Sequence, residues 1–123
     1  MEKKVIITNN DWVLYKYKEN FNVVYIDGTF KDVLIAVRDR LHMGYELLTH
    51  PLGGSVKPGE TPYKSIMVSD DKKNISFSSI YTIENAIITY DKFNKNKLKF
   101  INDRIADDLK LIDLTVLESA LNI

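Results

Sequence analysis

The sequence predicts a single-domain α/β fold in three layers, with a mainly parallel sheet of about four strands, helices on both faces and two C-terminal helices. Two observations lead to this prediction. Short β-branched runs alternate with segments of helical periodicity, a pattern typical of α/β sheets. The chain has 123 residues and is 45% hydrophobic, which suits one compact core and not two. We therefore treat residues 1–123 as one domain.

The first strand is expected at Lys4–Thr8, because "KVIIT" is a short β-branched run suited to burial on both faces. Asn9 and Asn10 follow it and offer side chains that cap helices. We expect them to begin a short helix that carries Trp12 into the core.

The second strand is expected at Asn22–Ile26, followed by a turn and a longer helix. Thr29 and Asp32 have the spacing of a capping box, and Gly44 suits a left-handed residue that ends the helix. His42, near that end, is expected to interact favourably with the helix dipole. The apolar residues at helical spacing are Phe30, Val33, Leu34, Val37 and Leu41.

A third strand is expected at Tyr45–Thr49 and a fourth at Tyr63–Ser69. Right-handed crossovers would place the first strand between the second and the third. The fourth strand has no helical crossover before it, so we expect it to pair antiparallel or to lie at the edge.

Two helices are expected at the C-terminal end. Ser78 or Ser79 caps the first, which runs to Tyr90, and a basic joint at Lys92–Lys99 precedes a helix over Phe100–Leu121. In the last helix one apolar stripe would cover the sheet and the other would meet a partner or a second copy of the chain. The alternative is a helix sandwiched between the sheet and the preceding helix. The two stripes are Ile101, Ile105, Leu109, Ile112, Val116 and Leu111, Leu114, Leu117, Leu121.

Composition argues against several classes of function. Lys+Arg and Asp+Glu both total 17, and no basic stripe suggests a nucleic-acid partner. No apolar run approaches the ~20 residues that span a bilayer, so we expect a cytoplasmic protein and no membrane partner. The absence of cysteine excludes disulfides, a thiolate nucleophile and zinc–thiolate sites, and two histidines argue against a metal. No cofactor is expected.

The predicted topology places a ligand site between the first and third strands. Such a switch point opens a crevice at the carboxyl ends of the strands. Its two sides would be Thr8–Asn10 and Thr49 with His50. The short helix would add partly positive N–H groups at Asn9 and Asn10.

The loop from Thr49 to Pro62 is the segment most unlike an ordinary turn. Its three prolines stiffen the backbone, and its length is near that of functional loops. Gly53 and Gly54 could form an anion-binding nest that Ser55 and Lys57 complete. The alternative interpretation of the two glycines is a tight corner without a ligand.

His50 is the candidate general acid or base, helped by Glu60 or by the Tyr63 phenol. The alternative is a histidine that bonds a backbone carbonyl. We expect Lys57 to hold the anion, because Lys64 is expected to point outward from its strand. The full predicted ligand-binding set is Asn9, Asn10, Thr49, His50, Gly53, Gly54, Ser55, Lys57, Glu60, Thr61, Tyr63 and Lys64.

Three segments together resemble the GrdX family, small proteins encoded with the glycine reductase genes of amino-acid-fermenting anaerobes. They are "ITNN" at 7–10, "DVLIAVRDRLHMGYELLTHPLGGSVKPGETPYKS" at 32–65 and "SIYTIENAI" at 79–87. The resemblance implies an anaerobic cytoplasm and selenium-dependent reductases that yield acetyl phosphate. It suggests acetyl phosphate, phosphate and glycine as ligands and glycine reductase components as partners. It supplies no catalytic residue.

Two functions from different classes fit the sequence. One is an accessory or sensing module that binds a small phosphate- or carboxylate-bearing metabolite at the 49–64 loop. The other is a small enzyme in which His50 moves protons on a carboxylate or phosphate substrate. We favour the accessory module, because it needs neither a strong nucleophile nor metal ligands.

Overall fold

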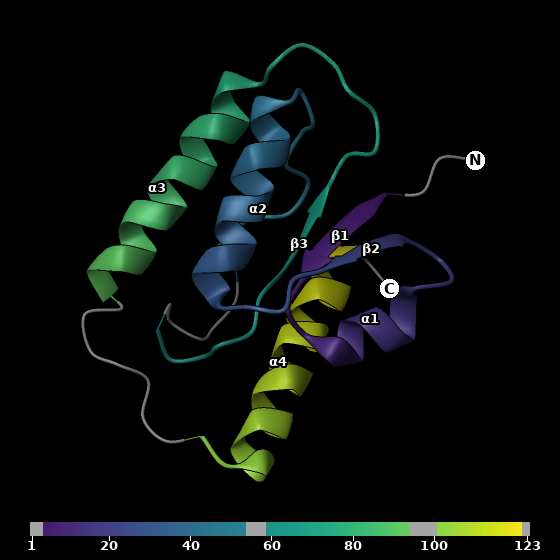
Figure 1. Cartoon of the computed structure of the whole chain (residues 1–123), viewed down its shortest axis with the longest axis vertical. Helices are drawn as coiled ribbons and strands as arrows, with labels where there is room; N and C mark the ends of the chain where they lie inside the picture. Colours follow the sequence, from purple (N-terminus) through teal and green to yellow (C-terminus); the bar gives the residue numbers. More distant parts are fainter. Residues whose placement is uncertain (1–3, 54–58, 94–100, 122–123) are drawn as a thin grey trace.

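A computed structural model describes residues 4–53, 59–93 and 101–121 of the chain. In the described residues, four helices surround a three-stranded mixed sheet (Figure 1). The strand order is β2-β1-β3, with β2 parallel and β3 antiparallel to β1. In chain order the elements are β1 (Val5–Thr8), α1 (Asp11–Tyr17), β2 (Asn22–Tyr25), α2 (Phe30–His42), β3 (Ser65–Val68), α3 (Phe77–Phe93) and α4 (Asp103–Leu121).

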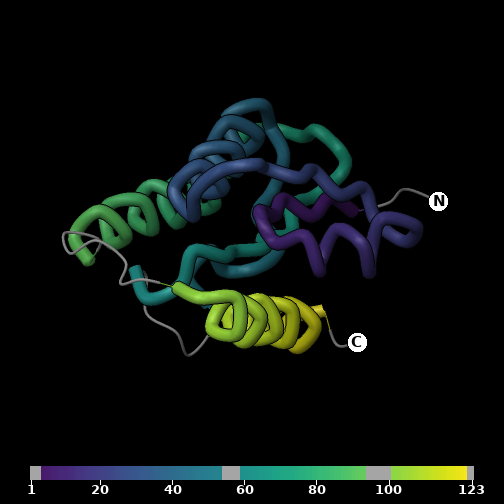
Figure 2. Tube along the Cα trace, turned by 60° about the horizontal axis from the view of Figure 1, so that its bottom comes forward, coloured from purple at the N-terminus to yellow at the C-terminus, as the bar shows by residue number. Residues whose placement is uncertain are grey.

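The central strand β1 divides the interior into two apolar cores. Its side chains alternate: Val5 and Ile7 pack with α2 and α3, whereas Ile6 packs with α1 and α4. Figure 2 shows α4 on the opposite side of the strands from α2 and α3. The molecule therefore has helices on both faces of a small sheet, in three layers.

The prediction of a four-stranded, mainly parallel sheet is wrong. The segment Tyr45–Thr49 forms only an isolated bridge, Leu47 to Val68, and the expected fourth strand pairs with β1 in its place. Burial explains the exchange. All four residues of β3 are buried, whereas the exposed Glu46 and Leu48 suit the 45–49 segment to the edge. The antiparallel direction expected for the fourth strand is confirmed.

The predicted helix signals lie close to the observed helix ends. Asn10 caps α1, and the Thr29–Asp32 capping box begins α2. Gly44 has φ +102°, the left-handed conformation expected after α2. At α3 the capping residue is Ser76 and not the predicted Ser78 or Ser79, because the Ser76 hydroxyl accepts a hydrogen bond from the Ser79 N–H. The expected start of the last helix, Phe100, and residues 94–99 of the basic joint lie outside the described residues.

Helix α4 packs on the α1 side of the sheet through Leu114 and Leu117, which join Ile6, Val13 and Met67 in one core. Ile105 and Leu111 remain exposed on its outer side. Because α3 covers the other face of the sheet, α4 is not sandwiched between the sheet and α3.

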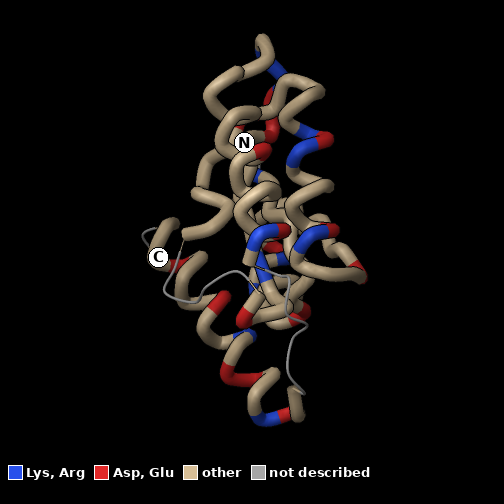
Figure 3. The backbone as a smooth tube through the Cα atoms, turned by 90° about the vertical axis from the view of Figure 1, so that its left-hand side faces the viewer, with Lys and Arg blue, Asp and Glu red and all other residues tan. Residues whose placement is uncertain are grey.

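The surface charges of the molecule are mixed in sign. Figure 3 shows Lys and Arg interspersed with Asp and Glu along the described backbone. Within the described ranges, no helix has the length and apolar character required to cross a membrane.

Candidate functional site

The candidate site forms where the start of β3 meets the end of β1. Antiparallel pairing places Ser65 opposite Thr8. The 46–49 segment runs along the other edge of β3, where Thr49 receives a 3.0 Å hydrogen bond from the Met67 N–H to its hydroxyl oxygen. The expected switch point between the first and third strands does not exist, because β3 lies between β1 and the 46–49 segment.

Asn9 joins three parts of the chain around this point. Its side-chain oxygen accepts the Lys64 N–H at 2.9 Å, and its NH₂ group donates to the carbonyls of Pro62 at 2.7 Å and Gly28 at 3.1 Å. Both amide hydrogens are thus used inside the protein. Asn9 holds the site together.

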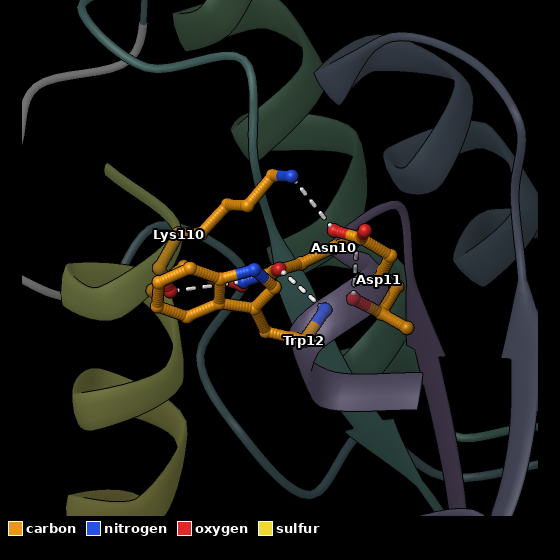
Figure 4. A network of polar contacts seen from close by, with 6 residues as sticks. Asn10, Asp11, Trp12 and Lys110 are labelled. Atoms are coloured by element: carbon orange, nitrogen blue, oxygen red, sulfur yellow. Dashed lines mark hydrogen bonds and ion pairs between the residues drawn. The ribbon is translucent and has the colours of Figure 1, made fainter. Parts of the chain in front are cut away.

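Asn10 similarly joins α1 to α4 (Figure 4). Its side-chain oxygen accepts the N–H of the half-buried Trp12 at 3.1 Å, while its NH₂ donates to Lys110 O and to Asp113 Oδ2, both at 3.0 Å. An ion pair of 2.9 Å between Lys110 Nζ and Asp11 Oδ1 adds a second link between the two helices. The Asn10 amide is fully engaged in fixing α4.

Asp113 is a buried carboxyl group that accepts the last hydrogen bond of a directed chain. The Ser65 hydroxyl donates to Asp113 Oδ2 at 2.7 Å, so the Thr8 hydroxyl must supply the hydrogen in the 2.7 Å Thr8–Ser65 contact. Burial raises the pKa of Asp113, and the donors on Asn10 and Ser65 oppose this shift. We call Thr8, Asn10, Ser65 and Asp113 the Asp113 network.

Lys64 is buried beside this network, with 6% of its surface exposed. The expectation that it points outward into solvent is therefore wrong. Its Nζ donates to Gly53 O at 2.9 Å. Burial lowers the pKa of Lys64, and the negative charge of Asp113 partly restores it. Lys64 is thus a desolvated amine whose hydrogen-bond partner is a neutral carbonyl.

Lys64 lines a cleft of about 340 Å³, which we call the Lys64 cleft. One wall comes from the 49–53 segment and the start of β3, and the other from the C-terminal part of α4. Its lining residues are Thr49, His50, Gly53, Lys64, Ser65, Val116, Leu117, Ser119 and Ala120. A neighbouring hollow of about 30 Å³ is lined by both Lys64 and Asp113, together with Thr61 and Tyr63.

His50 is exposed at the cleft, and its Nδ1 accepts the Leu52 N–H at 3.0 Å. In the neutral ring this bond fixes the tautomer in which Nε2 carries the hydrogen. The Thr49 hydroxyl accepts from Met67 and keeps its own hydrogen, which no other described residue accepts. The residues that line the cleft therefore include three kinds of donor, namely the Lys64 amine, the His50 ring N–H and the Thr49 hydroxyl.

The remaining predicted site residues either do not line the Lys64 cleft or belong to residues that the structure does not describe. Gly54, Ser55 and Lys57 fall in residues 54–58, which the structure does not describe. The Gly53 N–H donates to His50 O at 3.2 Å, so this group of the predicted nest is already bonded. Glu60 is exposed and does not line the Lys64 cleft.

Sequence reasoning missed Asp113 and the part that Ser65 plays. Asp113 lies beside Leu114 and one turn before Leu117, on the side of α4 that faces the sheet. In the sequence, Asp113 is a single carboxylate among the apolar residues on one side of the helix. Because buried charges require partners, this position could have indicated a polar contact with the sheet.

The comparison with family models confirms the resemblance to the GrdX family that the sequence segments indicated. The family model described as GrdX-like protein matches residues 5–122, nearly the whole chain. No curated protein and no solved structure matches the chain significantly. The matched range contains every residue of the Lys64 cleft and of the Asp113 network, and the chain belongs to the GrdX-like protein family.

Proposed function

We propose that this GrdX-like protein is a non-catalytic accessory protein of glycine-reductase-linked amino-acid fermentation. Its role is to bind a small phosphate- or carboxylate-bearing metabolite in the Lys64 cleft. The metabolic setting rests on the resemblance to the family, which also supports action in the cytoplasm beside glycine reductase components.

The buried Lys64 carries this proposal. An ammonium group that leaves water loses solvation, and a neutral carbonyl replaces only part of it. In the described part of the chain, no carboxylate lies within ion-pair distance of Lys64 Nζ, although Asp113 acts on its charge from further away. An anion in the cleft would supply the missing partner and gain charge-assisted hydrogen bonds.

The neighbouring donors favour binding over general-base catalysis by His50. Because Nδ1 of His50 is occupied by the Leu52 N–H, the nitrogen left for a ligand is the protonated Nε2. That nitrogen donates to an anion, whereas a general base at the same place would need a free lone pair. The Thr49 hydroxyl adds a second neutral donor. The arrangement fits an anion receptor better than an enzyme that uses His50 as base.

Calorimetric titration and thermal unfolding with phosphate, acetyl phosphate and glycine test the proposal. A ligand at ~100-fold excess over its Kd should stabilise the native state by about 2.7 kcal/mol, which raises the Tm by several degrees. Lys64→Gln should weaken binding by about tenfold or more, a loss of at least ~1.4 kcal/mol. His50→Ala, at an exposed position, should weaken binding without affecting the fold.

Lys31→Gln is the matched control, because Lys31 pairs with Asp91 on the α2–α3 side of the molecule. It should leave affinity unchanged. The proposal is wrong if no tested anion binds at millimolar concentration, or if Lys64→Gln and His50→Ala both bind as tightly as the wild type.

A further inference from the structure

Lys64 differs from the other lysines of the described chain. It alone is buried. By contrast, Lys16, Lys31 and Lys110 each pair with a carboxylate, at 2.6, 2.8 and 2.9 Å respectively. An ion pair holds an amine in its unreactive ammonium form, whereas burial without a close carboxylate favours the free amine. Lys64 also lines the cleft of about 340 Å³.

The geometry points to a chemical role for this amine: we propose that Lys64 forms a Schiff base with a small 2-oxo acid bound in the Lys64 cleft. This inference rests on the proposed anion site and narrows its ligand to carboxylates that carry an adjacent carbonyl group. Desolvated lysines are the usual amines of Schiff-base chemistry in proteins. Burial lowers the pKa of Lys64, so more of its amine is neutral near pH 7 than for a solvated lysine.

The reaction balances without an oxidant or reductant. The ammonium gives up one proton, and the neutral amine attacks the carbonyl carbon to form a carbinolamine. The carbinolamine hydroxyl then takes up a proton and leaves as water, while a C=N double bond forms. The product is a protonated imine. Lys64 therefore keeps its positive charge, and the ligand carboxylate keeps its counter-charge.

The cleft has the size and donors for such a ligand. Its volume of about 340 Å³ lies at the lower end of the about 300–1,000 Å³ typical of small-molecule sites. The His50 Nε2–H and the Thr49 hydroxyl can hold the carboxylate, while Val116 and Ala120 provide an apolar wall for a short carbon chain.

Asp113 supplies a route for the proton. It lines the hollow of about 30 Å³ beside Lys64, and this volume has room for one water molecule. Burial raises the pKa of Asp113, which makes the carboxylate a better proton acceptor than a solvated aspartate. Through that water, Asp113 would receive the proton of the ammonium and return it to the departing hydroxyl.

Reductive trapping tests the inference. The wild-type protein is incubated with glyoxylate or pyruvate and sodium cyanoborohydride, and the modified lysines are identified by peptide mass spectrometry. We expect Lys64 to be alkylated faster than the ion-paired Lys16 and Lys31, because burial lowers the pKa of Lys64 and leaves more of its amine neutral. Acetate has the carboxylate without the carbonyl, and it should slow the labelling of Lys64.

Two variants test whether the fast labelling comes from the Lys64 amine. Lys64→Arg keeps the charge without a nucleophilic amine, and it should lose the fast-labelled site while still binding phosphate. Lys110→Arg should leave labelling at Lys64 unchanged. If Lys64→Arg does not fold, mass spectrometry of the wild type still identifies Lys64 as the labelled amine, and slower labelling in phosphate shows that the anion binds beside it.

The results distinguish failure of this inference from failure of the anion site. Labelling of Lys64 no faster than that of Lys16 and Lys31, with phosphate binding retained, overturns the Schiff base and leaves the anion site standing. Absence of phosphate binding together with slow labelling overturns both. Fast labelling of Lys64 that acetate does not slow shows a reactive amine without a carboxylate site, which also overturns the inference.

Discussion

Asn9 and Asn10 have side chains suited to ligand binding, but here both side-chain amides form hydrogen bonds within the protein. A primary amide has two hydrogens to donate, and in both residues each hydrogen already meets an acceptor within the protein. A ligand at either amide would have to displace one of these bonds. The two residues therefore determine where Lys64 and α4 lie, and the donors that remain for the proposed ligand are Lys64, His50 and Thr49.

Replacing Asn9 should measure this bracing directly. Asn9→Ala removes three hydrogen bonds and leaves the buried Lys64 N–H without its acceptor. At about 1 kcal/mol for each bond, we expect the free energy of unfolding in urea to fall by about 2–3 kcal/mol. Asn85→Ala, at an exposed position on α3, is the control and should change it by less than ~0.5 kcal/mol. Equal effects of the two variants would show that Asn9 does not brace the fold.

At the scale of elements, the sequence predicted helices well and strand pairing poorly. A cap such as Thr29 with Asp32 is decided within four residues, so local sequence contains the information. The choice between Tyr45–Thr49 and Ser65–Val68 as the neighbour of β1 depends on contacts across the whole chain. Greater burial of the second segment decides it. Because Ser65–Val68 and not Tyr45–Thr49 pairs with β1, Lys64 at the entry to β3 is buried and not solvated as expected.

Helix α4 is held at its C-terminal end by a polar contact as well as by its leucines. Glu118 accepts hydrogen bonds from Lys16 Nζ at 2.6 Å and from the Tyr17 hydroxyl. These bonds lower the pKa of Glu118, and burial together with the Glu118 contact raises the pKa of Tyr17 to about 12. The contact joins α4 to the end of α1, opposite the Asn10 link at the start of α1.

This contact predicts a pH-dependent stability. The folded-state pKa of Glu118 lies below its unfolded value, so its stabilising contribution is complete above the unfolded value and disappears as the pH falls through the folded one. Glu118→Gln should lower the free energy of unfolding by about 1 kcal/mol at pH 7, a modest value because Lys16 is half-exposed. The difference from the wild type should shrink below about pH 4.

Urea unfolding at several pH values checks this prediction. Asp39→Asn, at an exposed position on α2, serves as the control and should follow the wild type throughout. A difference between Glu118→Gln and the wild type that stays constant from pH 7 to about pH 3 would contradict the assignment to the charged carboxylate.

At the scale of the whole molecule, the site is assembled from parts that are distant in sequence. Thr8, Thr49, Lys64 and Asp113 come from β1, the 46–49 segment, the entry to β3 and α4. The sequence could indicate the 49–64 loop, because its prolines and glycines are local features. It could indicate a carboxylate on the buried side of α4 but not its partners, since only the complete fold brings Asp113 against Ser65 at the start of β3.

Exposed apolar side chains lie on the outer sides of both C-terminal helices. On α4, Ile105 and Leu111 are 42% and 53% exposed, and on α3, Phe77 and Tyr81 are 82% and 71% exposed. Exposed apolar patches often mark interaction surfaces. Helix α4 packs on the sheet through Leu114 and Leu117, whereas Ile105 and Leu111 do not belong to either apolar core of the described residues. We therefore expect the outer side of α4 to contact a second copy of the chain, in keeping with the sequence expectation of an apolar surface on more than one side of this helix.

The last prediction is therefore a homodimer formed through the outer side of α4. Light scattering coupled to size exclusion should show a mass that rises with protein concentration. Leu111→Lys should reduce the mass to that of a monomer without lowering the Tm, since a charge at an exposed position changes stability by less than ~0.5 kcal/mol. Tyr81→Lys, the matched change on α3, should leave the dimer intact. A monomer at every concentration, or a dimer that only Tyr81→Lys disrupts, would show that the outer side of α4 is not the interface.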